Sequence, residues 1–184
     1  MTHSIAVLVG SLRKDSVTRK IARAIESVTP GLTFTHVEIG KVPLYDQDLD
    51  AEPPEAWGAL RDSLRTHDGY LFATPEYNRS VPGVLKNAID VASRPYGKSA
   101  FGAAKPAAVV SVSPGALGAF GANHHLRQSL VYLDLAVLPQ PEMYISNAMK
   151  LLDGSGGFVS EDTKAFFTRF GAMFTAWVAQ HAAT

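Results

Sequence analysis

The sequence predicts an α/β fold in which a doubly wound, five-stranded parallel sheet carries helices on both faces. Short apolar, β-branched runs recur along the chain, amphipathic stretches separate them, and loops rich in Gly, Pro and hydroxyl residues follow several of the runs. Parallel strands need crossover connections, and helices are the usual ones. The 184 residues are 46% hydrophobic, which is enough apolar material for one large core, so we expect a single domain over residues 1–184.

The first strand and the first helix are the clearest elements. Residues 5–9 form a continuous apolar run, as expected of a central strand that is buried on both faces. A helix is expected at residues 16–28, where apolar side chains recur at three- and four-residue spacing until Pro30-Gly31 stops the pattern. A second strand is expected at residues 33–39, and a long surface connection follows around residues 46–54.

The same alternation continues toward the C-terminus. The expected elements are a helix carrying Trp57, Leu60 and Leu64, a strand at 69–74, a helix at 81–93, a strand at 107–112, a helix at 122–133, a short fifth strand at 136–138 and an amphipathic helix at 162–179. The last helix carries an aromatic stripe of Phe166, Phe167, Phe170, Phe174 and Trp177. A stripe at helical spacing indicates core packing rather than a cofactor site.

Composition and charge exclude several classes of function. The 17 basic residues balance 17 acidic ones, which disfavours a nucleic-acid or anionic-membrane partner. Cys is absent, so thiol nucleophiles, disulfides and thiolate metal centres are excluded and redox chemistry needs a cofactor. The six His residues, including His124-His125, lack metal-ligand spacing, so no metal site is expected. With neither a basic leader nor a run of about 18 apolar residues, the sequence predicts a soluble, cytoplasmic protein.

The first candidate site is the loop at residues 10–18, because ligands of doubly wound folds lie beyond the carboxyl ends of the strands. This loop is rich in hydroxyls, contains Arg13 and leads into a helix, whose unpaired N–H groups favour a phosphate. The alternative is that Asp15 or Ser16 is simply an N-cap. The loop lacks the glycine patterns of nucleotide hydrolases and of dinucleotide-binding domains, which disfavours triphosphate hydrolysis and tightly held NAD.

Two further loops follow later strands. Residues 74–83 contain Pro75 and Pro82, which stiffen the backbone, and Tyr77, which offers a flat surface to a heteroaromatic ring. The alternative is a plain surface turn that uses Asn and Pro for backbone reasons. Residues 113–118 are small enough to let a ligand approach the backbone closely, although a Gly-rich loop is a weak signal alone.

Several short motifs occur together in a fixed order, which is far more specific than any one loop. They are Gly10-Ser11-Leu12-Arg13 with Ser16, Leu44-Tyr45-Asp46, Pro75-Glu76-Tyr77-Asn78, Ser80-Val81-Pro82-Gly83, Leu85-Lys86-Asn87-Ala88-Ile89-Asp90, Lys105-Pro106 and His125-Leu126-Arg127. Through these motifs the chain, up to about Glu142, resembles the NADPH-dependent FMN reductase family. That family has a flavodoxin-like fold and includes bacterial quinone, chromate and azo-dye reductases.

The resemblance implies FMN as cofactor and NADPH or NADH as co-substrate. It implies a phosphate site in the first loop and a ring site in the second, with the third loop nearby. The implied cofactor-binding residues are Ser11, Arg13, Ser16, Val17, Thr18, Pro75, Glu76, Tyr77, Asn78, Ser113 and Gly115. Position 18 often holds Asn in relatives, so Thr18 is a modest departure. No catalytic side chain is expected, because the cofactor supplies the chemistry and Glu76 is interpreted as shaping its loop.

The expected function is an FMN-dependent NAD(P)H oxidoreductase that reduces quinones, flavins, azo compounds or chromate by hydride transfer through bound FMN. The alternatives are a non-enzymatic, flavodoxin-type electron carrier and a flavodoxin-fold binding protein without flavin turnover. Carriers of that type are typically strongly acidic, so the neutral charge of this chain favours the enzyme. Arg79, beside the second loop, could meet the 2′-phosphate of NADPH or be solvated.

Two helical segments, at residues 81–93 and 124–138, are apolar on more than one face. Their apolar residues are Val84, Leu85, Ala88, Ile89 and Val91 in the first and Leu126, Leu130, Val131, Tyr132 and Leu133 in the second. Because a sheet buries one stripe of each helix, the surplus predicts a homodimer or homotetramer, with Leu130 as an interface residue. The alternative is burial of the surplus within one chain. The other expected partner is a small-molecule electron acceptor.

Overall fold

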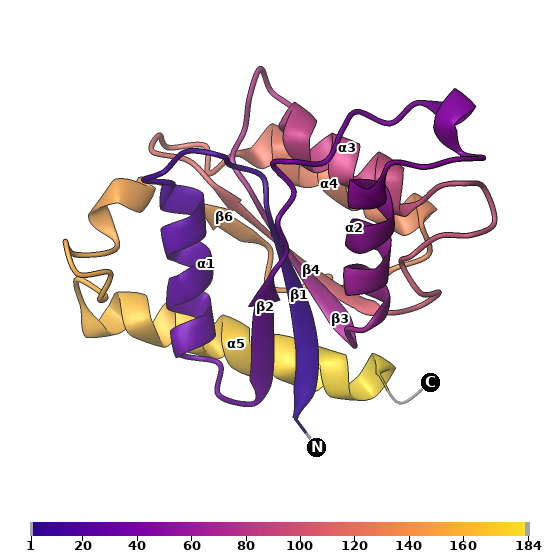
Figure 1. Cartoon of the computed structure of the whole chain (residues 1–184). Helices are drawn as coiled ribbons and strands as arrows, with labels where there is room; N and C mark the ends of the chain where they lie inside the picture. The colour runs from indigo at the N-terminus through magenta and orange to yellow at the C-terminus, as the bar shows by residue number, and fades with distance from the viewer. Residues whose placement is uncertain (1, 183–184) are drawn as a thin grey trace.

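A parallel sheet organises the chain in the computed structural model, which describes residues 2–182 (Figure 1). Its strands are β1 (His3–Val9), β2 (Leu32–His36), β3 (Gly69–Thr74), β4 (Pro106–Val112), β5 (Ala136–Val137) and β6 (Met143–Ile145). The strand order is β2-β1-β3-β4-β5, and β6 also pairs with β4. From β1 the chain runs outward to β2 on one side, and from β3 it runs outward to β4 and β5 on the other. The switch in strand order, where ligands of such sheets bind, therefore lies between the carboxyl ends of β1 and β3.

The edge of the sheet beside β4 is divided between two short strands. β5 pairs with Pro106 and Ala107, whereas β6 pairs with residues 110–112 of the same strand. Between them lie Pro139 and Pro141, which lack the N–H that a ladder requires. The expected fifth strand at 136–138 is therefore confirmed as β5, while β6 was not predicted.

The helices form two layers, one on each face of the sheet (Figure 1). α1 (Val17–Ser27) and α5 (Glu161–His181) cover one face, and α2 (Glu55–Arg65), α3 (Gly83–Ala92) and α4 (Phe120–Tyr132) cover the other. Two 3-10 helices, η1 (Gln47–Leu49) and η2 (Ala148–Lys150), lie in the connections. The predicted doubly wound α/β architecture is confirmed. Among residues 2–182 no helix is both long and apolar enough to cross a membrane.

The side chains of β1 alternate between the two cores that these layers enclose. Ile5, Val7 and Val9 belong to the core beneath α1 and α5, whereas Ala6 and Leu8 belong to the core beneath α2, α3 and α4. The aromatic stripe of α5 fills the first core, with Phe167, Phe170 and Phe174 almost completely buried. The prediction of a core role is confirmed for these three, but Phe166 is exposed at the rim and Trp177 is only partly buried.

The packing of α4 corrects one expectation about assembly. Leu126 and Leu130 are completely buried against the sheet, so the prediction that Leu130 is an interface residue is wrong. The two residues are four apart and therefore share the face of α4 that the sheet covers. Val131 and Tyr132, which point elsewhere, are 64% and 72% exposed.

Candidate functional site

A cavity of about 260 Å³ lies where the loops after β1, β3 and β4 meet. Its lining residues are Ser11, Arg13, Ser16, Val17, Thr18, Pro75, Glu76, Tyr77, Val112, Ser113, Pro114 and Met149. All the residues expected from the sequence to bind the cofactor line it, except Asn78 and Gly115. The three loops, which are far apart in the sequence, thus form one site at the switch point of the sheet.

Ser16 and Arg19 organise the first loop. Ser16 is the N-cap of α1, because its hydroxyl accepts a hydrogen bond of 3.2 Å from the N–H of Arg19. The Arg19 guanidinium donates to the carbonyl oxygens of Ser11 at 3.2 Å and Arg13 at 3.4 Å. The loop is thereby held against the first turn of α1. Arg19 was not predicted, because a basic residue one turn into a helix carries no distinctive sequence signal.

The first loop also keeps several donors available for a ligand. Ser11 and Thr18 are each only 4% exposed, yet within residues 2–182 neither hydroxyl has a hydrogen-bond partner. Both residues line the cavity, so their hydroxyls are available to a polar ligand there. The exposed Arg13 guanidinium likewise has no partner in the described chain. With the N-terminus of α1 beside them, these groups suit a phosphate dianion.

A tight turn shapes the second loop. The backbones of Tyr77 and Ser80 exchange two hydrogen bonds of 3.1 and 3.0 Å, and the intervening Asn78 and Arg79 have φ angles of 51° and 64°. Positive φ at both central residues is the property of a type I′ turn, and Asn tolerates it well. The backbone therefore explains the residue type at position 78. The turn leaves the half-exposed ring of Tyr77 at the cavity wall.

Glu76 fixes the second loop to the start of α4. Its Oε2 accepts a hydrogen bond of 3.0 Å from the N–H of Ala122, in a helix whose own N-cap residue, Ala119, has no side-chain cap. Close packing adds to the link, since a Cβ at Gly121 would stand 2.7 Å from the carbonyl oxygen of Arg79. Glu76 thus acts on the backbone of α4, in agreement with its interpretation as a residue that shapes the loop.

The third loop is held by the segment that follows β6. The N–H of Asn147 donates to the carbonyl oxygen of Gly115 at 3.0 Å, and that of Ala148 donates to the carbonyl oxygen of Ser113 at 3.1 Å. These bonds bring Met149 of η2 to the cavity wall. Met149 was not predicted, because nothing in the local sequence indicates that η2 returns to the switch point. Among the described residues, no three His, Asp or Glu side chains are grouped to hold a metal ion.

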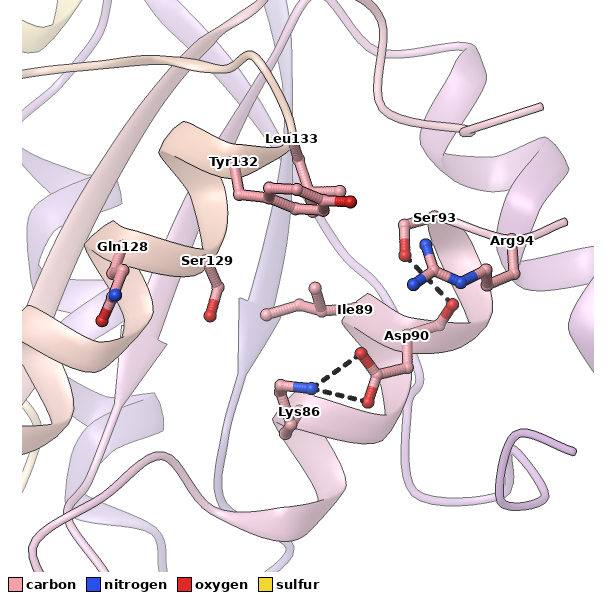
Figure 2. A pocket seen from close by; sticks show the side chains of 9 residues that line it. All are labelled: Lys86, Ile89, Asp90, Ser93, Arg94, Gln128, Ser129, Tyr132 and Leu133. Carbon is pink, nitrogen blue, oxygen red and sulfur yellow. Dashed lines mark hydrogen bonds and ion pairs between the residues drawn. The ribbon is translucent and has the colours of Figure 1, made fainter. Parts of the chain in front are cut away.

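A separate groove of about 350 Å³ lies between α3 and α4, away from the three loops (Figure 2). It is lined by Lys86, Ile89, Asp90, Ser93, Arg94, Gln128, Ser129, Tyr132 and Leu133. Lys86 and Asp90 are bound to each other across one turn of α3 at 2.8 Å. This groove contains none of the residues expected to bind a cofactor.

The fold and the cavity together define a class of protein: a flavodoxin-like α/β protein whose switch point suits a phosphate joined to a flat ring. Comparison with known proteins gives the family. The family model of the NADPH-dependent FMN reductases matches residues 3–150, so the chain belongs to this family. The expected family, fold class, enzyme class and FMN cofactor with a reduced nicotinamide co-substrate are thereby confirmed.

Relatives match over almost the whole chain. A quinone reductase of Pseudomonas putida is 54% identical over 178 residues, which span 96% of this chain and 95% of the relative. A 2-hydroxy-1,4-benzoquinone reductase of a Burkholderia species is 47% identical over 179 residues, 97% of each chain. Among solved structures, FerB, a flavoenzyme NAD(P)H:(acceptor) oxidoreductase of Paracoccus denitrificans, is 39% identical with a TM-score of 0.92, covering 98% of this chain and 99% of FerB.

Proposed function

We propose that this protein is an FMN-dependent NAD(P)H oxidoreductase that reduces quinones, and that its switch-point cavity binds the FMN. Overall, NAD(P)H and a proton reduce a quinone to a hydroquinone and leave NAD(P)⁺. The observation that carries the proposal is that the hydroxyls of Ser11 and Thr18, two residues that line the cavity, have no hydrogen-bond partner in the described chain. The names of the relatives from Pseudomonas putida and the Burkholderia species support quinones as the acceptor class.

In this proposal the first loop holds the phosphate of FMN. Ser11, Thr18 and Arg13 donate to its oxygens, and the start of α1 adds a favourable dipole. Ser16 already accepts a hydrogen bond from the helix, so its own O–H remains free to donate to the phosphate. The first loop therefore contributes affinity and orientation rather than a reacting group.

The second and third loops position the ring. Pro75 and Tyr77 offer apolar surface on one side, and Ser113 with Pro114 borders the cavity from β4. The cavity encloses about 260 Å³, slightly less than the roughly 300–1,000 Å³ that ligand pockets usually enclose. When bound, FMN supplies the capacity to take up hydride equivalents from NAD(P)H and pass them to an acceptor. Flavins, azo compounds and chromate are proposed as secondary acceptors.

Initial-rate kinetics test this function. Because co-substrate and acceptor must use the same open ring, NAD(P)⁺ should leave before the quinone enters, and double-reciprocal plots should be parallel. The measurement varies NADPH at several fixed quinone concentrations with FMN-loaded protein. Intersecting lines would contradict a shared site and indicate a complex that holds both substrates.

We also propose that residues 1–184 form one domain, and that Asn78 and Gly115 belong to the cofactor site through their backbones.

We propose further that the protein is a cytoplasmic homodimer or homotetramer. The groove between α3 and α4 (Figure 2) and the exposed side chains of Val131 and Tyr132 supply the surface for assembly. Light scattering should give two or four times the 19.7 kDa chain mass, and Tyr132→Glu should lower that mass. A wild-type mass of one chain would contradict the assembly.

A further inference from the structure

Two completely buried polar side chains flank the third loop, residues 113–118, in the sequence without lining the cavity. Ser111 belongs to β4, which leads into the loop, and Asn123 belongs to the first turn of α4, which follows it. Ser and Asn are mostly exposed in folded proteins, and buried polar side chains are usually hydrogen-bonded. The burial of these two residues therefore has to be matched by hydrogen bonds.

The two side chains form one network with the end of the loop. The Ser111 hydroxyl donates to the carbonyl oxygen of Gly118 at 2.6 Å and accepts from the amide nitrogen of Asn123 at 3.0 Å. Asn123 Oδ1 accepts from Nε of Arg127 at 2.9 Å, and Nη1 of Arg127 donates to the carbonyl oxygen of Leu138 at 2.9 Å. The network therefore ties the last residue of the loop to β4, to α4 and to the segment after β5.

The end of the loop has a backbone conformation that needs such support. Gly118 and Ala119 have φ angles of 56° and 58°, in a left-handed region that Ala rarely adopts. A Cβ at Gly118 would stand 2.8 Å from the carbonyl carbon of Tyr144, so only glycine fits there. Residues in such conformations persist where surrounding contacts fix them, and they cluster at ligand sites. The 2.6 Å bond from Ser111 is one of these contacts.

The start of the loop is fixed by other bonds. The N–H of Ser113 donates to the carbonyl oxygen of Ile145 at 2.9 Å, and Ser113 and Pro114 line the cavity. We propose that Ser111 is a positioning residue for the flavin, because its hydroxyl fixes the far end of the loop whose near end forms the cavity wall. The inference rests on the proposed function. Ser111 acts through the loop, so its loss should weaken binding of the ring and spare the contacts with the phosphate.

Flavin binding to apoprotein variants, followed by flavin fluorescence, tests this role without turnover. Ser111→Ala removes both bonds of the hydroxyl, so the Kd of FMN and the Kd of riboflavin should rise by the same factor, about tenfold. Asn123→Asp places a second oxygen beside Ser111, which competes with Gly118 for the hydroxyl proton, so the same joint rise is expected. Ser111→Thr retains the hydroxyl and should restore most of the affinity for both flavins.

Thr29→Ala is the matched control for loss of a buried hydroxyl. Thr29 is also buried, and its hydroxyl donates to the carbonyl oxygen of Ile25 at 2.7 Å, at the end of α1 opposite to the first loop. This variant should lower Tm and leave both Kd values unchanged. Unchanged flavin affinity in either folded variant of the network, a loss for FMN alone, or an equal loss in Thr29→Ala would overturn the proposal. Wild-type apoprotein that binds neither flavin would instead refute the proposed function, and this role with it.

Discussion

Replacing Arg13 and Ser11 by Ala should weaken FMN binding while leaving the fold intact. Both side chains line the cavity. The guanidinium of Arg13 and the hydroxyl of Ser11 have no partner among residues 2–182, so their removal leaves no other group of the described chain without a hydrogen bond. A hydrogen bond to a charged group is worth about 1.5–3 kcal/mol. Because Arg13 is exposed and screened by solvent, we take the lower value for each, about 3 kcal/mol together.

That free energy corresponds to roughly a hundredfold rise in the Kd of FMN for the double variant. Quenching of flavin fluorescence on titration with apoprotein measures it, at two salt concentrations. Riboflavin, which lacks the phosphate, completes a thermodynamic cycle: it should bind weakly to wild type and equally weakly to the variant. Arg169→Ala, an exposed arginine of α5, is the matched control and should not change the Kd of FMN.

Two results would refute this account of the first loop. If the double variant lost FMN and riboflavin affinity by the same factor, the residues would act through the loop fold rather than through the phosphate. If FMN affinity were unchanged, the phosphate would lie elsewhere.

The remaining predictions concern stability. Glu76→Ala removes the carboxylate that caps α4 at Ala122, so it should lower the free energy of unfolding by about 1 kcal/mol and Tm by about 2–4 °C. Glu76→Gln retains an acceptor and should cost less. Equal losses in the two variants would contradict the capping role. Hydrogen bonds from Ser4 lower the pKa of Asp68, so its contribution is present above its unfolded pKa and is lost as pH falls through the folded value. Asp68→Asn should therefore lower Tm at neutral pH, with a difference from wild type that shrinks below about pH 4, and a constant difference would contradict the pKa shift.

The sequence predicts the central part of the fold because burial on both faces leaves a clear pattern. The run from Ile5 to Val9 and the helix after Ser16 follow from continuous hydrophobicity and 3.6-residue periodicity. β6 was not predicted, because it has only three residues, which follow two prolines and show no periodicity. Leu130 was assigned to the wrong face because α4 is apolar on several sides, and only packing decides which stripe meets the sheet.

For the candidate site, the sequence likewise predicts some residues and not others. Ser11, Arg13 and Tyr77 lie directly after strands, so the topology alone brings them to one edge. Arg19 and Met149 act through tertiary contacts, one by holding carbonyl groups and the other by the return of η2 to the cavity. Such contacts have no signature in a single sequence.

The most direct test of the central claim is an anaerobic two-step titration of purified, FMN-loaded protein, followed by flavin absorbance. NADPH alone should bleach the flavin, and a quinone added after removal of the nucleotide should restore the colour, with no second protein present. Colour that persists after NADPH, or that bleaches only when a partner protein is added, would contradict the enzyme and favour an electron carrier.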